Sequence, residues 1–159
     1  MKKLILMRGL PGSGKSTAAR EIAAQHMTSD RGQSVAICST DSYFIEDDKY
    51  VFRPEKLGVN HNANQDRVRD LMRVGVEVII VDNTNTTNKE MKPYKDAAQR
   101  HGYDITETLI GREFLFAELD QDVLQDAHRF KDYLALCHER GTHGVPMDVI
   151  EKMARRFQK

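Results

Sequence analysis

The sequence predicts an α/β fold in which helices cover both faces of a parallel sheet. Short, continuous apolar runs alternate along the chain with longer runs of helical spacing, an order that is typical of parallel strands joined by helices. A glycine-rich stretch, Gly9–Thr17, lies between the first apolar run and the first helical run, where such folds place a ligand-binding turn. A length of 159 residues without repeats or linkers fits a single domain, residues 1–159.

The composition narrows the class of protein. Lys and Arg (24) balance Asp and Glu (24), so an argument for nucleic acid must rest on a local surface and not on net charge. Cys38 and Cys137 belong to no CxxC pair, which argues against a zinc site and favours a reducing, cytoplasmic setting. The apolar run Leu4–Met7 is too short for a signal peptide, and no run approaches the roughly 20 residues of a membrane helix. No membrane association is expected.

The first half of the chain contains two expected strands and two expected helices. The apolar run Lys3–Arg8 predicts a first strand that stops at the glycine-rich stretch, and a helix is expected over Lys15–Met27. Ser34–Ser39 predicts a buried second strand. A polar stretch follows, and helical spacing resumes over Asn60–Val74. Ligands bind beyond the carboxyl ends of the strands in such sheets, and three strand ends are chemically marked in this chain, at Gly9, Asp41 and Asp82.

The second half begins with the most strand-like run, Glu77–Asp82, which is rich in β-branched residues. Thr87 is a candidate N-cap for a helix that ends near His101. Pro93 should kink that helix or shift its start, because proline removes a backbone donor. Tyr103–Ile110 predicts a fourth strand, which completes a four-stranded sheet.

The C-terminal part of the sequence predicts a helical lid over about residues 113–159. Glu113–Glu139 has mainly helical spacing, in two pieces, and Pro146 suits the first turn of a last helix. The stretch RGTHGVP, residues 140–146, connects these helices, and its glycines give the backbone the freedom that a moving segment needs. Arg140 at the start of this stretch is a candidate for contact with a ligand at the strand ends.

The stretch GLPGSGKST follows the P-loop pattern G-x-x-x-x-G-K-S/T, so the expected fold is of the P-loop NTPase type. Its glycines let successive backbone N–H groups face phosphate oxygens, and the following helix points its positive end at the same place. Lys15 is expected to neutralise the β- and γ-phosphates of ATP, and the Ser16 hydroxyl to bind Mg²⁺. The expected nucleotide-binding residues are Gly9, Pro11, Gly12, Ser13, Gly14, Lys15, Ser16 and Thr17.

Acidic residues follow the second and third strands. Asp41 lies just past the second strand, where a kinase can place the general base that accepts the proton of the attacking hydroxyl. A turn-forming role or an indirect contact to Mg²⁺ are its alternatives. Asp82 ends the third strand, a position from which an acid orients Mg²⁺ through its waters or through the Ser16 hydroxyl.

Several polar residues are candidates for contact with a second substrate. His61 and Gln65 are four residues apart, so they share one face of the expected helix, although a solvated helix start explains them as well. Asn83 and Asn85 continue from the third strand into the same crevice. Their alternative is a hydrogen-bonded turn that leads to the cap at Thr87.

The chain resembles the P-loop 5′-polynucleotide kinases in GLPGSGKST, VDNTNTTNKEMKPY and RGTHGVPMDVIEKM, and KLGVNHNANQ is similar to eukaryotic kinase modules of this group. The resemblance implies transfer of the ATP γ-phosphate to a 5′-hydroxyl end of DNA or RNA. It also implies that Lys15 and Ser16 hold ATP and Mg²⁺, that Asp41 is the general base and that Asp82 supports the metal site. Arg140 corresponds to a lid arginine that contacts the ATP phosphates.

Two positions differ from the phage-type pattern of this family. The phage-type enzyme has an arginine three residues after its base, which contacts the phosphate next to the acceptor hydroxyl, and Phe44 stands there in this chain. It also has a second lid arginine where this chain has Leu136. Both differences weaken the case for a polynucleotide acceptor more than the case for a kinase. Tyr43 or Phe44 is expected to stack on a base instead, and one of the two is expected to belong to the core.

Three functions follow from these residues. The first is a 5′-hydroxyl polynucleotide kinase that needs no obligate protein partner, the second is a kinase of a nucleoside or other small metabolite, and the third is a non-catalytic nucleotide switch. The third leaves Asp41 unexplained. From residue 140 onward, five Lys or Arg stand against two Asp or Glu, a local excess that suits a groove for nucleic acid phosphates, although cations also favour an ordinary helix end.

Overall fold

The computed structural model describes residues 1–115 and 123–158. A four-stranded sheet has the order β2-β5-β1-β6, and all its neighbouring strands are parallel. The strands are β1 (Lys3–Arg8), β2 (Val35–Cys38), β5 (Val78–Asp82) and β6 (Asp104–Leu109). The predicted parallel sheet is confirmed, and each strand matches its predicted range to within one residue at either end.

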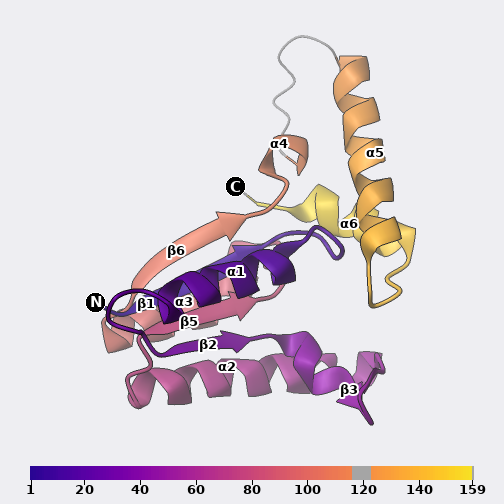
Figure 1. The fold of residues 1–159 in the computed structure, drawn as a ribbon. Helices are drawn as coiled ribbons and strands as arrows, with labels where there is room; N and C mark the ends of the chain where they lie inside the picture. The colour runs from indigo at the N-terminus through magenta and orange to yellow at the C-terminus, as the bar shows by residue number, and fades with distance from the viewer. Residues whose placement is uncertain (116–122, 159) are drawn as a thin grey trace.

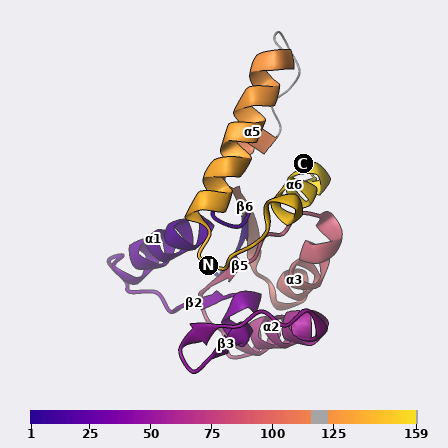
Figure 2. The same ribbon diagram turned by 90° about the vertical axis from the view of Figure 1, so that its right-hand side faces the viewer.

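Helices cover both faces of this sheet (Figures 1 and 2). The helix α1 (Lys15–Met27) packs its alanines against Ile5 and Met7 of β1 and against alternate residues of β5. The helices α2 (Leu57–Arg73) and α3 (Asn88–His101) pack on the opposite face, against Leu4 and Leu6. Because side chains alternate along a strand, continuous apolar runs fill both of these layers.

The strand β6 differs from the central strands because it lies at the edge of the sheet and pairs only with β1. Most of its residues are exposed, which accounts for the polar side chains in DITETL. The strands β1 and β5 are central and almost wholly buried. Their burial explains why the sequence signal was strongest there.

The ends of α3 follow from two residues. The Thr87 hydroxyl accepts a hydrogen bond from the Glu90 backbone N–H at 3.3 Å, as an N-cap does. Gly102 ends the helix in the left-handed region with a φ of 73°. The helix starts at Asn88 and continues through Pro93, so the proline does not shift its start.

A short hairpin between β2 and α2 is not among the predicted elements. The 3-10 helix η1 (Thr40–Phe44) leads into β3 (Ile45–Glu46), which pairs antiparallel with β4 (Lys49–Tyr50). The turn residues Asp47 and Asp48 have positive φ values of 48° and 62°, as a two-residue hairpin turn requires. A second 3-10 turn, η2 (Pro54–Lys56), then starts α2 three residues before the predicted Asn60.

The predicted lid is formed by α4 (Arg112–Leu115), α5 (Val123–Arg140) and α6 (Met147–Arg156). The helices α5 and α6 stand beyond the carboxyl ends of the strands, to which the arrows in Figure 1 point. Pro146 is the N-cap of α6 and not its first residue. The expected helical region between residues 116 and 122 lies outside the described residues. Among the helices of the described part, none is long and apolar enough to cross a membrane.

Candidate functional site

The P-loop connects β1 to α1 and turns at two glycines. Gly12 and Gly14 have φ values of 76° and 94°, which a residue with a side chain adopts only under strain. Gly14 occupies the N-cap of α1 without a side-chain cap, so the first N–H groups of the helix are available to an anion. Lys15, the first residue of α1, is 8% exposed and lines the cavity described next.

A cavity with a volume of about 1460 Å³ opens at the carboxyl ends of the strands, between the P-loop, the η1 segment, α2, α3 and the lid. Typical ligand pockets have volumes of about 300–1,000 Å³, so this cavity has room for two substrates side by side. The predicted nucleotide-binding residues that line it are Pro11, Gly12, Gly14, Lys15, Ser16 and Thr17. Gly9 and Ser13 are not part of this lining.

The lid rests directly on the P-loop. Leu10 packs in one apolar cluster with Leu134 and Cys137 of α5 and with Ile150 of α6. A Cβ atom built on Gly12 would lie 1.9 Å from the Cys137 carbonyl oxygen, so the position needs glycine for contact as well as for conformation. This packing brings the end of α5, with Arg140, to the cavity.

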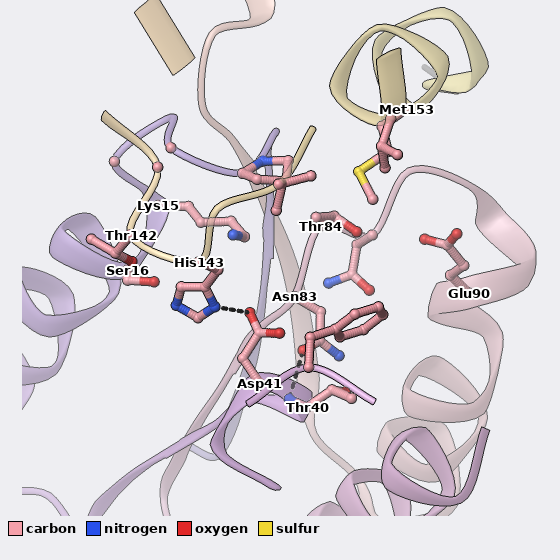
Figure 3. Close-up of a pocket in the computed structure, with 18 of the residues that line it drawn as sticks. Lys15, Ser16, Thr40, Asp41, Asn83, Thr84, Glu90, Thr142, His143 and Met153 are labelled. Atoms are coloured by element: carbon pink, nitrogen blue, oxygen red, sulfur yellow. Dashed lines mark hydrogen bonds and ion pairs between the residues drawn. The ribbon is translucent and has the colours of Figure 1, made fainter. Parts of the chain in front are cut away.

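Asp41 lies on η1, on the opposite side of the cavity from the P-loop. Its carboxylate is 49% exposed, and its Oδ2 lies 3.8 Å from Nδ1 of His143 in the lid. The Tyr50 hydroxyl donates to Oδ1 of Asp41 over 3.4 Å. Figure 3 shows Lys15 and Asp41 pointing toward the same space, with His143 beside Asp41. Lys15, the predicted phosphate-binding residue, and Asp41, the predicted base, therefore face one cavity.

The segment that carries Asp41 is fixed through its neighbour Thr40. The Thr40 backbone N–H donates to Oδ1 of Asn83 at 2.9 Å, and the Thr40 hydroxyl lies 3.0 Å from Nδ1 of His61. The amide of Asn83 also donates to the Tyr94 hydroxyl at 3.3 Å. These bonds join the ends of β2 and β5 to α2 and α3, and they leave the Asp41 side chain free to face the cavity.

Asp82 ends β5 beside β1, where it is paired in register with Met7, just before the P-loop. It is 6% exposed, and its Oδ1 has no hydrogen-bond partner among the described residues. An unsatisfied buried carboxylate oxygen is costly unless a ligand or a hydroxyl completes it. Ser16 lines the cavity and Asp82 does not, but carboxylate and hydroxyl oxygens are the ligands that Mg²⁺ takes, so the chemistry of both side chains fits the predicted metal.

The predicted substrate residues separate into two groups. His61 and Gln65 of α2 line the cavity, as do Asn83 and Asn85. The Asn85 side chain is only 2% exposed and donates to the Met7 carbonyl at 2.7 Å. The side-chain amides of Asn83 and Asn85 thus form hydrogen bonds within the protein. The Gln65 side chain has no hydrogen-bond partner among the described residues.

Tyr43 and Phe44 do not line the cavity, so the expectation that either stacks on a substrate base does not fit the geometry. Phe44 is 2% exposed and belongs to the interior, while the Tyr43 hydroxyl points to the Ala63 carbonyl, 3.4 Å away. The residues after Asp41 form a 3-10 turn and not an extended loop, which directs Phe44 inward. The expectation that one of the two belongs to the core is met by Phe44.

Two aromatic residues that the sequence analysis did not single out line the cavity instead. Tyr50 and Phe52 come from the hairpin and the residues that follow it, and Phe52 is 50% exposed. A signal for them exists in the sequence, because Asp47 and Asp48 separate two short runs of strand-forming residues. His143 also touches this region, with its ring centroid 3.8 Å from that of Tyr50.

The pKa of Tyr50 is raised to about 12, first by burial and then by the nearby carboxylate of Asp41. The phenol is therefore neutral at physiological pH and acts as a hydrogen-bond donor to Asp41. The pKa of Cys137, next to the P-loop, is raised mainly by burial, so its thiol is protonated and not a nucleophile.

Comparison with known proteins gives related chains that are larger than this one. Human NEDD4-binding protein 2 is 35% identical over 156 residues, which are 98% of this chain, and the chain spans about 8% of that protein's length. A chain in the structure of the Pnkp1/Rnl/Hen1 RNA repair complex matches 99% of this chain and 44% of its own length, with 23% identity and a TM-score of 0.56. Kti12 of Chaetomium thermophilum, solved with ADP-AlF3, matches 98% of this chain and 80% of its own length, with 18% identity and a TM-score of 0.60.

The two structural neighbours match nearly the whole of this chain, so they share its fold. The family model AAA_33, described as an AAA domain, matches residues 4–159, which is nearly the whole chain. The chain belongs to the AAA_33 family of P-loop proteins.

Proposed function

We propose that this protein is an ATP-dependent kinase that transfers the γ-phosphate to the 5′-hydroxyl end of DNA or RNA. The observation that carries the proposal is the placement of Lys15 and Asp41 on opposite sides of one cavity that is large enough for two substrates. A nucleotide switch needs no acidic group facing the phosphate loop. The fold that this chain shares with a chain of the RNA repair complex supports a nucleic acid context.

In this proposal ATP lies with its phosphates on the P-loop, and the side chains of Lys15 and Arg140 stabilise the charge of the transferring group. Ser16 and Asp82 would hold Mg²⁺, which would supply positive charge against the phosphates of ATP. Asp41 accepts the proton of the 5′-hydroxyl as its oxygen attacks phosphorus. The bond between the γ-phosphorus and the β–γ bridging oxygen breaks, and ADP and a 5′-phosphate end leave.

His143 gives the lid a direct link to the base. It lies on the loop after Arg140, and its Nδ1 is 3.8 Å from the Asp41 carboxylate. An ATP-bound lid that holds Arg140 on the phosphates would therefore hold His143 on Asp41 as well. Closure over the nucleotide and orientation of the base would then be one event.

A small-molecule kinase is the second candidate, and one observation favours it. Residues 40–65 contribute no Lys or Arg to the cavity lining, although a long nucleic acid acceptor needs cations along its phosphates. Such an enzyme would use the same P-loop and the same base. The two candidates differ in the acceptor alone, so one assay separates them.

The test is transfer of a radiolabelled γ-phosphate from ATP to 5′-hydroxyl DNA and RNA oligonucleotides, run beside a panel of nucleosides. We expect label on an oligonucleotide. Label on a nucleoside with none on any oligonucleotide would select the small-molecule kinase. Binding of ATP with no transfer to any acceptor would favour the nucleotide switch.

Both cysteines are buried and free, which supports the proposal that the enzyme works in the reducing cytoplasm.

A further inference from the structure

Three apolar side chains line the cavity on its acceptor side, and we call Tyr50, Phe52 and Leu57 the hairpin platform. Phe52 is 50% exposed and Leu57 is 38% exposed. Large side chains usually bury their apolar area in the core, and exposed apolar area inside a cavity marks a binding surface. Neither the P-loop chemistry nor the proton transfer at Asp41 uses this area.

A buried residue holds the platform in place. Phe44 is 2% exposed, and its ring centroid lies 5.2 Å from that of Phe52 and 6.1 Å from that of Tyr50. The Val51 backbone N–H donates to the Phe44 carbonyl at 2.8 Å. The Arg53 guanidinium donates two hydrogen bonds to the Glu46 carboxylate, of 2.8 and 2.9 Å. The rings are therefore fixed before any ligand binds, which lowers the entropic cost of binding.

The platform lies next to the candidate base. The Tyr50 hydroxyl is 3.4 Å from Oδ1 of Asp41, and Phe52 follows two residues later on the same cavity wall. An acceptor whose hydroxyl lies at Asp41 must place its next chemical group near these rings. In a 5′-terminal nucleotide that group is the sugar with its planar base.

The charge of this wall favours a base over a phosphate as the group it binds. The residues from 40 to 65 that line the cavity include Asp41 as their one charged carboxylate and no Lys or Arg. The basic lining residues come from the P-loop, α1, α3 and the lid. Aromatic faces bind bases of any sequence by stacking, whereas a phosphate would need a cation at this wall.

We propose that the hairpin platform binds the 5′-terminal nucleobase of the acceptor, with Phe52 as the stacking residue, and this proposal rests on the proposed kinase function. Stacking recognises the presence of a base and is tolerant of its identity. The platform also gives Phe44 a role where the phage-type pattern has an arginine. Phe44 supports a base-binding surface from below and does not contact the acceptor itself.

The experiment compares two oligonucleotides of one sequence, both with a 5′-hydroxyl. One carries a normal 5′-terminal nucleotide, and the other carries an abasic 5′-terminal sugar. With the unaltered protein, the abasic acceptor is expected to have a kcat/KM lower by roughly 5- to 150-fold, the range that stacking of one base supports. Phe52→Ala should lower kcat/KM for the normal acceptor by a similar factor and leave the abasic acceptor and the KM for ATP unchanged.

Ile45→Ala is the matched control, because Ile45 is also 50% exposed on the same hairpin but does not line the cavity. It should leave both acceptors unchanged, and Phe52→Tyr should restore the preference for a base. Equal kcat/KM values for the two acceptors with the unaltered protein overturn the platform, and this comparison requires no variant to fold. An equal loss on both acceptors in Phe52→Ala overturns it too. Absence of transfer to either acceptor instead contradicts the proposed kinase function.

Discussion

Asp41 is the residue on which the proposed chemistry depends most. It is half exposed to the cavity, and its segment is held by hydrogen bonds from Thr40 to Asn83 and His61. Two groups contact its carboxylate, the Tyr50 hydroxyl and the His143 ring. Neither belongs to the P-loop, so a change at Asp41 should act first on the acceptor side.

Asp41→Asn removes the proton acceptor and keeps the size of the side chain. We expect kcat to fall by about 10²- to 10⁴-fold, because that is the usual contribution of a general base. The affinity for ATP, measured by calorimetry, should stay within about twofold, since amide and carboxylate are of one size and Asp41 lies away from the P-loop. Asp47→Asn is the control, because Asp47 is exposed at the hairpin turn with a positive φ that Asn tolerates. A large loss of ATP affinity in Asp41→Asn would contradict the role as a base.

Tyr50 predicts a pH dependence of stability. Its pKa is about 12 in the folded protein against an ordinary value of 10.0. The folded state therefore binds the phenol proton more tightly than the unfolded state, and this stabilisation is complete below pH 10 and is lost as the pH rises to about 12. Relative to Tyr50→Phe, the unaltered protein should lose free energy of unfolding across that window. Urea unfolding at pH 8 and at several points in the window measures this, and two parallel stability curves would contradict it.

At the scale of elements, the contact between α5 and the P-loop couples the lid to the nucleotide. Leu10 and the apolar side of α5 and α6 form one cluster, and the backbone of α5 lies directly against Gly12. Movement of α5 therefore changes the surroundings of the phosphates, and a phosphate on the P-loop favours one position of α5. The lid is a packed element and not a loose flap.

Gly12→Ala should separate α5 from the P-loop. The added Cβ would lie 1.9 Å from the Cys137 carbonyl oxygen, so α5 must shift, and Arg140 and His143 shift with it. Turnover should fall on the order of 100-fold, the effect of a displacement of about 1 Å in an active site.

Gly32→Ala is the matched control for this change. Gly32 also has a positive φ, 54°, but its Cβ would meet no atom nearer than 3.8 Å. It shares the conformational strain of about 1 kcal/mol without the clash, so it should lower the melting temperature and leave turnover unchanged. Equal turnover in the two variants would show that the contact with α5 does not matter for activity.

At the scale of the whole molecule, Arg8 joins three distant parts of the chain. It is 3% exposed at the end of β1, and it donates to the Asn85 carbonyl at 2.9 Å, to the Thr86 carbonyl at 3.4 Å and to the Gln158 carbonyl. It also forms an ion pair of 3.2 Å with Glu107 of β6. The backbone N–H of Gln158 returns a hydrogen bond of 2.8 Å to Thr86. The C-terminus is thereby tied to the loop that follows Asp82.

Arg8→Met keeps the apolar stem and removes the hydrogen bonds and the ion pair that the Arg8 guanidinium forms. We expect a loss of about 2–5 kcal/mol in the free energy of unfolding, because several buried acceptors lose a charged donor. Arg73→Met, which breaks an ion pair whose side chains are 65% and 68% exposed, should cost less than about 0.5 kcal/mol. Urea unfolding of both variants measures the difference. A small effect in Arg8→Met would show that the Arg8 contacts contribute little to holding the C-terminal residues in place.

The central strands, the P-loop and the start of α3 could be predicted from the sequence because their sequence patterns are local and strong. The strands β1 and β5 have apolar central residues, the P-loop has a defined pattern, and Asp41 and Asp82 mark the ends of two strands. The N-cap of α3 at Thr87 could likewise be predicted, because threonine is a preferred residue at the start of a helix. These features fix the edge of the sheet where the cavity lies.

The hairpin and its platform were harder to predict from the sequence, for physical reasons. The strands β3 and β4 have two residues each, too few to show a period. Phe44 is three residues from Asp41 on the same 3-10 turn, but its ring is buried against Tyr50 and Phe52 whereas the Asp41 side chain is half exposed. Tyr50 and Phe52 reach the cavity only because the hairpin folds back. Such placement depends on tertiary contacts that spacing along the chain does not encode.

The measurement that tests the account most directly offers one oligonucleotide in two forms, with a 5′-hydroxyl end and with a 5′-phosphate end, together with ATP labelled at the γ-phosphate. The account predicts label on the 5′-hydroxyl form alone, with transfer slower by about 10²- to 10⁴-fold in Asp41→Asn at matched ATP occupancy. Equal labelling of both forms, or labelling of neither form while a nucleoside is phosphorylated, would contradict it.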